Sequence, residues 1–324
     1  MLGLLVLLLL PVAWIDFSMV GGMGRSIAHA IGALRDGAGA LGRGELEHRI
    51  QIKGDDDLWE TARQFNRMAE GLEHARELEQ ERARLEGEME LARRIQQRLL
   101  PAAPPAVPGL EIAGRSEPAR EVGGDYYDHF DVGGGRVLLV IADVSGKGVP
   151  AALLMSGFRA SLMSQDANTL GPEELAQRIN EFLHRSVESG KFVTTFLGLL
   201  DAATGRLVYA NAGHNPPALL RADGSVEWLT TAGLVLGIMP HWRFEGGEAR
   251  LEPGDLLALY TDGVTEGANA SSELWGEDRL VAALRRVAGR PCAEAAAALV
   301  REVRAFEGDT GPADDITVLL ARRT

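Results

Sequence analysis

Residues 121–148 read EVGGDYYDHFDVGGGRVLLVIADVSGKG, and this stretch decides the fold. The apolar run at residues 137–142 has the length and composition of a buried strand. Asp125 follows a Gly-Gly pair, and Asp143 comes where the apolar run ends, directly before a Ser-Gly-Lys-Gly turn. A carboxylate at the end of a buried strand is costly to bury alone, and a bound cation offsets that cost. We therefore expect Asp125 and Asp143 to hold metal.

The composition is that of an ordinary globular protein of 324 residues, a length that predicts about two domains. Lysine and arginine number 33 and aspartate and glutamate 46, so the formal net charge is −13. This acidic balance implies no basic surface and argues against nucleic acid as a partner. The single cysteine, Cys292, excludes an intramolecular disulfide and a cysteine-based zinc cluster.

The amino-terminal residues 1–24 are mostly apolar and contain no basic residue before Arg25. The uncharged run at 2–15 is shorter than the ~20 residues that cross a bilayer, but counting on to residue 24 reaches that length. We expect a single-pass membrane helix here; the alternative is a buried or interfacial helix. The arginines that follow place the rest of the chain, including any catalytic domain, in the cytoplasm by the positive-inside rule: Arg25, Arg35 and Arg43.

Two helical heptad patterns follow, one from Ile27 to Leu41 and one from Leu58 to Leu72. One helix alone does not bury a seam of this kind. With the extended connector between the two patterns and the stretch GDDDLWETARQFNRMAEGL at 54–72, residues 25–76 resemble a HAMP signal-relay domain. Such domains are parallel four-helix bundles made by two chains, so the resemblance implies a homodimer. The alternative is an ordinary helical hairpin.

Residues 77–101 are dense in helix formers and predict a linker helix that stops at Pro101. We expect this helix to pair as a coiled coil in the homodimer, and a single solvated helix is the alternative. The proline-rich residues after it mark a boundary with a domain over 102–324. The heptad-like face consists of Leu78, Leu85, Met89, Ala92 and Leu99, with Arg82 and Gln96 interrupting it.

The carboxy-terminal residues 102–324 alternate strand-like runs, glycine turns and paired helical segments. Short turns between the strands favour antiparallel pairing, and helices that cover a sheet core give an α+β domain. The expected strands are 137–143, 192–200, 206–211, 217–221, 226–230, 255–261 and 316–321, and the expected helices are about 150–164, 172–188, 276–288 and 291–306.

Two further acidic points lie at strand ends. Asp262 follows the apolar run LLALY at 256–260, and Asp314 and Asp315 precede the run ITVLL. Antiparallel neighbours place the start of one strand beside the end of another, so these acids can converge with those of the first stretch. An all-oxygen, carboxylate-rich site suits magnesium or manganese, and several carboxylates without imidazole indicate a two-metal centre.

Five motifs stand in order along this domain: EVGGDYYD, ADVSGKGVPAALLM, NAGHNPP, YTDGVTEGAN and ADDITVLL. They resemble the PPM (type 2C) metal-dependent protein phosphatases, and most of all the bacterial SpoIIE-like branch. The upstream ARRIQQRLLP is similar to the helix that enters the catalytic domain in that branch, so the resemblance covers about residues 90–324. It implies an α-β-β-α sandwich and hydrolysis of phosphoserine or phosphothreonine.

The resemblance also implies roles for the acids. Asp143 would bridge two divalent ions, Mn²⁺ or Mg²⁺, and the carbonyl of Val144 would join it on one ion. Asp262 and Asp314 would hold the other ion. Asp125 would bind a metal-coordinated water. All four acids of the motifs are present, which predicts an active enzyme.

Other residues near these motifs have two open interpretations each. Asp315 is the alternative to Asp314 as a ligand. Arg120 lies five residues before the first motif acid, where some PPM enzymes place a phosphate-binding arginine; the alternative is a solvated surface arginine. Lys147, in the Ser-Gly-Lys-Gly turn, has the same two interpretations. For His214 we expect the hydrogen-bonding residue of a tight turn rather than a general acid.

The family resemblance suggests a phosphorylated anti-sigma-factor antagonist as the substrate, under control of a signal passed through the HAMP and linker segments. A diguanylate cyclase is the main rival, because Gly-Gly-Asp follows a HAMP-like segment. That rival requires Glu-Phe next, where this chain has Tyr126-Tyr127. A histidine kinase would need a histidine on a helix seam followed by an ATP-binding pattern, and this sequence has no such arrangement. A non-catalytic, membrane-tethered interaction module would be favoured by a missing metal ligand, and none is missing.

Overall fold

The structure is a computed structural model that describes residues 2–51, 57–103, 106–186, 190–231, 233–308 and 311–324. The chain divides into two compact units, Met1–Glu88 and Met89–Thr324. Asp55 and Asp56, at the start of the stretch that resembles the second HAMP helix, lie outside the described residues, and so do Pro104 and Pro105 of the proline-rich linker.

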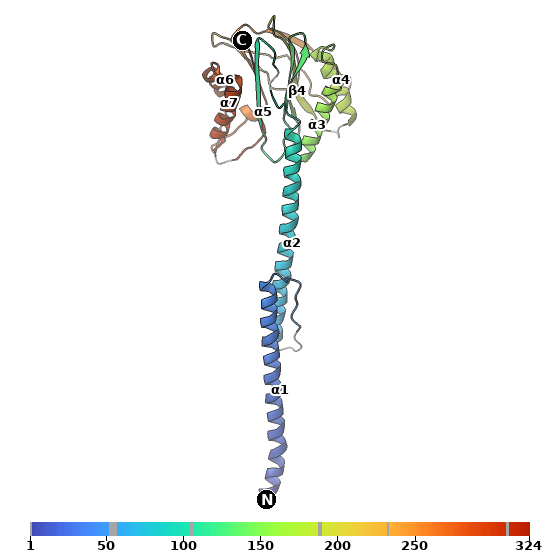
Figure 1. Cartoon of the computed structure of the whole chain (residues 1–324), viewed down its shortest axis with the longest axis vertical. Helices are drawn as coiled ribbons and strands as arrows, with labels where there is room; N and C mark the ends of the chain where they lie inside the picture. The colour runs from blue at the N-terminus through green and yellow to red at the C-terminus, as the bar shows by residue number, and fades with distance from the viewer. Residues whose placement is uncertain (1, 52–56, 104–105, 187–189, 232, 309–310) are drawn as a thin grey trace. The chain divides into compact units, whose positions relative to one another are not determined.

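The amino-terminal unit is built from two helices, α1 (Leu2–Gly42) and the first part of α2 (Asp57–Gln97). The end of α1 and the start of α2 lie side by side, with the connector along them (Figure 1). Ile50 of the connector packs on Ala62 and Phe65 of α2. A Cβ at Gly37 of α1 would lie 2.7 Å from the Ile50 side chain, so a larger residue there would make that side chain shift.

Asn66 of α2 fastens the connector through both atoms of its side-chain amide. Its Nδ2 donates to the carbonyl of Ile50 at 2.9 Å, and its Oδ1 accepts from the Ile50 amide at 2.8 Å. The apolar side chains of the predicted seams are only partly covered within one chain, because Ile31 is 57% exposed and Leu72 45% exposed. The amino-terminal unit therefore retains an apolar stripe along both helices.

No helix in the described part of the chain is both long enough and apolar enough to span a membrane. The membrane helix predicted over residues 1–24 is therefore not supported by the structure. Helix α1 instead continues without a break through residue 24 to Gly42 and includes the charged residues Arg25 and Arg35.

The carboxy-terminal unit contains two five-stranded antiparallel sheets among its described residues. The strands are β1 (Leu110–Glu117), β2 (Tyr126–Gly133), β3 (Arg136–Val144), β4 (Val193–Asp201), β5 (Arg206–Ala212), β6 (Ala218–Leu220), β7 (Val226–Trp228), β8 (Gly246–Arg250), β9 (Leu256–Tyr260) and β10 (Ile316–Arg323). Their orders are β1-β10-β9-β6-β7 and β2-β3-β4-β5-β8.

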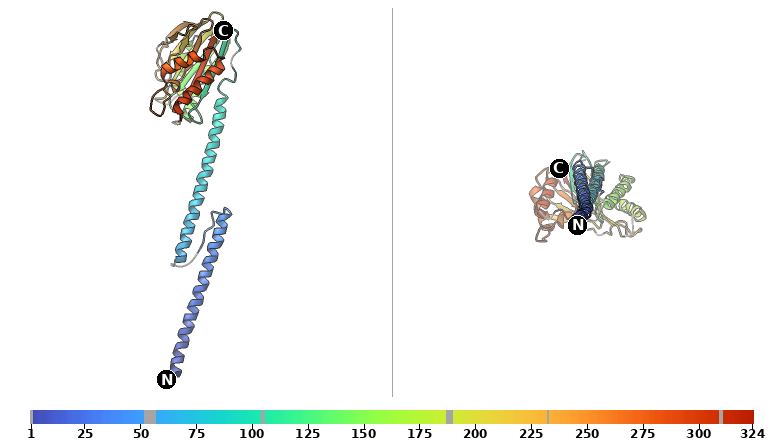
Figure 2. Two further views of the ribbon diagram at one scale, coloured as in Figure 1. Left: turned by 90° about the vertical axis from the view of Figure 1, so that its left-hand side faces the viewer. Right: turned by 90° about the horizontal axis from the view of Figure 1, so that it is seen from below.

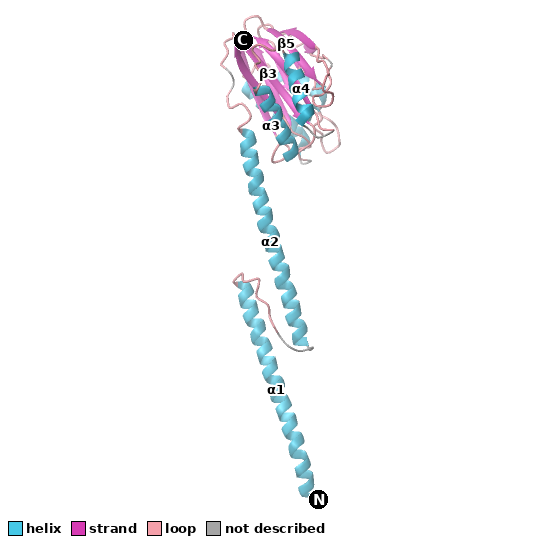
Figure 3. Ribbon diagram, turned by 90° about the vertical axis from the view of Figure 1, so that its right-hand side faces the viewer, coloured by secondary structure: helices cyan, strands magenta, loops and turns pink. Residues whose placement is uncertain are grey.

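Helices cover the outer face of each sheet. Helices α3 (Val149–Met163) and α4 (Pro172–Ser186) lie on the β2-β3-β4-β5-β8 sheet (Figure 3). Helices α6 (Gly276–Val287) and α7 (Cys292–Glu307) lie on the other sheet, and Figure 2 shows them in front of its strands. The unit is thus the predicted α-β-β-α sandwich.

Strand β3 shows why the first stretch decides the fold. Val137, Leu139 and Ile141 belong to the core between the two sheets. The alternate residues Leu138 and Val140, together with Ala142, pack under α3 and α4. A strand alternates its side chains between two faces, so a continuous apolar run is what a strand buried on both faces needs.

Among the described residues the structure contains the predicted strands and helices and adds the strands β1, β2 and β8 and the short helix α5 (Asp262–Thr265). The linker helix predicted to reach Pro101 ends at Gln97, and the last two residues of the predicted helix 172–188 lie outside the described residues. Strand β2 escaped prediction because it is polar as well as buried: Asp128 and His129 are both buried. Strand β8 begins with Gly246-Gly247, which is weak in strand propensity. A Cβ at Gly247 would lie 2.2 Å from the ring of Tyr209, so the aromatic packing of the neighbouring strand requires the glycine.

Candidate active site

The four predicted acids lie at the ends of two strand pairs, one in each sheet. Asp125 directly precedes β2 and Asp143 is the last residue but one of β3, and the pairing of Tyr126 with Ala142 sets them beside each other. In the other sheet Asp262 follows β9 and Asp314 precedes β10. Those two ends also meet, since the two strands pair up to Tyr260 and Val318. The antiparallel convergence expected from the sequence is present.

Thr261 joins the two strand pairs. Its hydroxyl donates to Oδ2 of Asp125 at 2.7 Å and accepts from the backbone N–H of Thr317 at 3.1 Å. Asp125 is only 6% exposed, so this hydrogen bond holds a carboxylate that is otherwise inside the protein. The sequence motif YTDGVTEGAN indicates a role for Asp262, but nothing in the sequence distinguishes Thr261 from other threonines.

The acids influence one another electrostatically. Burial, followed by the charges of Asp262 and Asp314, raises the pKa of Asp143 to about 7. Burial and the charge of Asp143 raise the pKa of Asp125 well above its usual value. Burial and Asp314 likewise raise the pKa of Asp262. Mutual repulsion of buried carboxylates is the environment that a divalent cation relieves.

The donor set fits magnesium or manganese, which prefer oxygen ligands. No three His, Cys, Asp or Glu side chains among the described residues are grouped closely enough to hold an ion by themselves. The carbonyl oxygen of Val144 lies close to Gly124, because a Cβ built on that glycine would be 2.9 Å from it.

Asp315 has a structural role that separates it from Asp314. Its Oδ1 accepts from the amide of Ala119 at 2.7 Å, and its Oδ2 accepts from the amide of Gly124 at 2.7 Å. The Asp315 carboxylate is therefore occupied in holding the loop before β2. The Asp314 carboxylate accepts instead from Lys147 and from the amide of Asp315. Both acids lie close enough to Asp143 for their charges to raise its pKa.

Lys147 pairs with Asp314, because its Nζ lies 2.8 Å from Oδ2 of that acid and 2.6 Å from the carbonyl of Ala313. The ammonium thus competes with any metal ion for Asp314. The pair is about half exposed, and such pairs contribute about 1 kcal/mol or less.

We expect Lys147→Met to bind Mn²⁺ up to about fivefold more tightly, because the competing ammonium is removed. Isothermal titration of the full chain with MnCl₂ measures this affinity. Lys191→Met, at a second lysine beside the same glycine turn, is the control and should match the unchanged protein. Weaker Mn²⁺ binding by Lys147→Met would show that the lysine supports the ion rather than competing with it.

Arg120 and His214 have different surroundings. Arg120 is exposed in the bend before the first motif acid. His214 is buried, its Nδ1 lies 2.8 Å from the hydroxyl of Thr194, and its backbone N–H donates to Asn211. Burial lowers the pKa of His214 to about 4, so the ring is neutral at pH 7. These contacts favour the predicted turn residue over a general acid.

Gln96, which interrupts the predicted linker seam, contacts the loop that carries Asp125. Its Nε2 donates to the carbonyl of Gly123 at 2.6 Å, and its Oε1 accepts from the Gly123 amide at 3.0 Å. The sequence did not reveal this contact. The signal that was available was a polar residue in an apolar heptad position.

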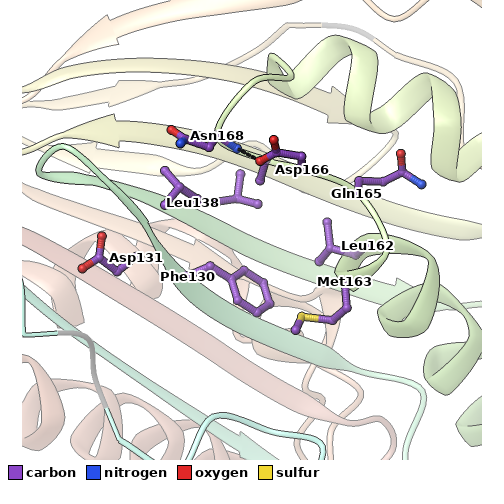
Figure 4. Close-up of a pocket in the computed structure, with 10 residues that line it drawn as sticks. Phe130, Asp131, Leu138, Leu162, Met163, Gln165, Asp166 and Asn168 are labelled. Atoms are coloured by element: carbon purple, nitrogen blue, oxygen red, sulfur yellow. Dashed lines mark hydrogen bonds between the residues drawn. The ribbon is translucent and has the colours of Figure 1, made fainter.

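A separate cavity of 280 Å³ lies towards the other end of β3 (Figure 4). Phe130, Leu138, Leu162 and Met163 form its apolar wall, and Asp166 accepts from the Asn168 amide at its polar rim. Leu138 lies near the start of β3, whereas the acids lie near its end. The cavity is therefore not part of the carboxylate site.

Comparison with known proteins agrees with the motifs. The family described as stage II sporulation protein E (SpoIIE) matches residues 133–324, and the HAMP domain matches residues 22–74. Protein IcfG of Synechocystis sp. is 31% identical in an alignment of 277 positions, which covers 76% of this chain and 43% of that protein. The phosphoserine phosphatase RsbU of Bacillus subtilis is 34% identical over 183 residues, 56% of this chain and 54% of that protein. The chain spans about half the length of these relatives.

Solved structures share the fold. The PP2C domain of SiaA from Pseudomonas aeruginosa is 25% identical, with a TM-score of 0.65, and the match covers 74% of this chain and 98% of that one. The RsbU and RsbW domains of a Mycobacterium tuberculosis protein are 32% identical, with a TM-score of 0.56, over 68% of this chain and 61% of that one. Because the family match covers more than half of the sequence, the chain belongs to the SpoIIE family, with a PP2C-type (PPM) domain that follows a HAMP domain.

Proposed function

We propose that this chain is a metal-dependent protein phosphatase that hydrolyses phosphoserine or phosphothreonine. The observation that carries the proposal is the meeting of Asp125 and Asp143 with Asp262 and Asp314 at one end of the two sheets. The phosphoserine phosphatase activity named for the relative RsbU supports it. The assignment of individual residues to metal ions, given next, is part of the same proposal.

In the proposed site Asp143 and the carbonyl of Val144 would hold one divalent ion, and Asp143, Asp262 and Asp314, together with water, would hold a second. When bound, Mn²⁺ or Mg²⁺ supplies positive charge for the phosphoryl group and activates water for attack. The protein supplies the geometry. The hydroxyl of Thr261 holds the carboxylate of Asp125, which is 6% exposed, in a position from which it would accept a hydrogen bond from the attacking water.

The substrate that we propose is a phosphorylated anti-sigma-factor antagonist. The support is the similarity to RsbU and to IcfG over the catalytic region. The site also lies on the outside of a folded domain, and Lys147 and Asp314 at its edge are each more than 40% exposed. A phosphorylated side chain on a protein surface can reach an open site of this kind.

We also propose that the chain acts as a homodimer at a membrane. The HAMP match and the uncovered apolar stripe that includes Ile31 and Leu72 support the dimer. The attachment through residues 1–24 rests on their composition and on the HAMP domain that follows. A signal would pass from the HAMP helices along α2, which continues unbroken from Asp57 to Gln97.

The test of the proposed function is phosphate release from a purified phosphoserine protein by the full chain, with MnCl₂, MgCl₂ or EDTA. Release with Mn²⁺ or Mg²⁺ and none with EDTA is the expected result. Folded chain that binds metal but releases no phosphate would favour a non-catalytic interaction module. A cyclic dinucleotide made from GTP would indicate a diguanylate cyclase, which the SpoIIE match does not favour.

Arg120 provides a second test. We expect Arg120→Ala to raise KM for the phosphoprotein by about tenfold or more, because a charge-assisted hydrogen bond to phosphate is worth about 1.5–3 kcal/mol. Steady-state kinetics at saturating Mn²⁺ measure this effect. Arg115→Ala is the control, since Arg115 is already paired with Glu117 at 2.7 Å. If both variants have the same KM as the unchanged chain, Arg120 does not bind the phosphate.

A further inference from the structure

We propose that Gln96 is a positioning residue for the active site: it holds the loop before Asp125, so that the seating of the end of α2 sets the affinity for metal. The inference rests on the proposed function, because it concerns the same site. It assigns a specific atom-level link to the coupling between the linker helix and the phosphatase domain.

The contact is a two-point one. The amide side chain of Gln96 donates to the Gly123 carbonyl and accepts from the Gly123 N–H, at 2.6 and 3.0 Å. Both polar groups of one peptide residue are therefore satisfied by a single side chain, in the way that a neighbouring strand would satisfy them. Gly123 and Gln96 both belong to the carboxy-terminal unit.

The opposite side of the loop is equally restrained. Oδ2 of Asp315 accepts from the amide of Gly124 at 2.7 Å. A Cβ on Gly123 would lie only 2.4 Å from that same oxygen. The loop is thus clamped between α2 and the start of β10, and a shift on the Gln96 side moves the backbone that leads into Asp125.

Gln96 contacts the loop before Asp125, whereas the residues next to it in the sequence have other surroundings. Leu99 and Leu100, just beyond the helix end, pack on the core under α3 and α4. Gln97 is exposed, and Ile95 is 56% exposed. A rotation of the helix end would therefore move the Gln96 amide away from Gly123.

The two hydrogen bonds between Gln96 and Gly123 are sensitive to small displacements of the helix end. Hydrogen bonds weaken sharply once the donor–acceptor distance passes about 3.5 Å, so a displacement of about 1 Å breaks both contacts. Asp125 keeps its hydrogen bond to Thr261 only while the loop stays in place. Release of the helix end thus loosens one wall of the carboxylate cluster.

The experiment compares Gln96→Met with Gln97→Met in the full chain. Methionine keeps the length and helix propensity of glutamine but makes neither hydrogen bond. Mn²⁺ affinity is measured by isothermal titration, which requires no substrate, and thermal unfolding is measured in EDTA. We expect roughly tenfold weaker Mn²⁺ binding for Gln96→Met and unchanged binding for Gln97→Met. The kcat at saturating Mn²⁺ should fall less than the affinity.

Equal Mn²⁺ affinity in Gln96→Met and the unchanged chain would overturn the inference, and so would an equal loss in Gln97→Met. If Gln96→Met does not fold, Gln96→Ala is measured in the same way, with the same two criteria. Weaker Mn²⁺ binding by the Gln96 variant, in a chain that releases no phosphate from phosphoserine protein, would support the inference and refute the proposed function. Unchanged Mn²⁺ binding by the Gln96 variant, in a chain with normal phosphatase activity, would refute the inference and support the proposed function.

Discussion

Asp143→Asn is expected to abolish metal-dependent phosphate release and at the same time to stabilise the metal-free protein. The loss of release should be on the order of a thousandfold, because metal-assisted charge stabilisation is worth several kcal/mol and each 1.36 kcal/mol is tenfold in rate. The assay is phosphate release from a phosphoserine protein with Mn²⁺. Asp201→Asn is a matched control, since Asp201 pairs with the other end of β3 opposite Arg136.

The stabilisation follows from the sign of the pKa shift. Burial and the neighbouring acids raise the pKa of Asp143 in the folded protein from 3.8 to about 7. Stability from such a group is fully present below the unfolded pKa and is lost as pH rises through the folded one. The metal-free protein should therefore lose stability between about pH 4 and pH 7, and Asp143→Asn should lose less.

Thermal unfolding in EDTA at pH 5 and pH 8 tests this second effect. At pH 8 the asparagine variant should be more stable by on the order of 1 kcal/mol or more, which is roughly 2–4 °C for a unit of this size. At pH 5 the difference should shrink. Full phosphate release by Asp143→Asn would remove Asp143 from the site, and a variant no more stable at pH 8 would show that the acids do not repel each other.

Gly263→Ala is expected to destabilise the protein by about 3 kcal/mol and to reduce metal-dependent activity together with it. A Cβ at Gly263 would lie 2.0 Å from the backbone carbonyl of Asp315. That oxygen is part of the chain entering β10 and has no flexible side chain to move aside. The entry to β10 must therefore shift, and it carries Asp314 away from Asp262.

Gly157→Ala is the control for this clash. Gly157 lies inside α3, where an added Cβ meets no atom within 4 Å, so alanine should stabilise by about 0.5–1 kcal/mol. Urea unfolding of the full chain, followed by circular dichroism, gives both values. A midpoint for Gly263→Ala equal to that of the unchanged protein would mean that the β9 and β10 ends are not packed as tightly as described.

The local patterns of the sequence predict an α+β domain with helices covering antiparallel strands, and the arrangement as an α-β-β-α sandwich came from the family resemblance. The apolar run of β3 at 137–142 and the helical spacing of α4 and α7 depend on neighbours a few residues away. Aspartates next to apolar runs are also a local signal, and the prediction that Asp125, Asp143, Asp262 and Asp314 form the site rests on it. Strand β2 was missed because it carries Asp128, a buried acid that pairs with Arg159 of α3, far away in the sequence.

Only the tertiary structure decided which neighbour serves which purpose. Asp314 and Asp315 are adjacent in sequence and chemically identical, yet the Asp315 carboxylate accepts from backbone amides of the loop before β2, while the Asp314 carboxylate pairs with Lys147. Gln96 looked like an interruption of a seam and turned out to hold Gly123. Contacts of this kind join residues far apart along the chain, so their strength depends on how two sheets and a helix pack, and no local pattern in the sequence records it.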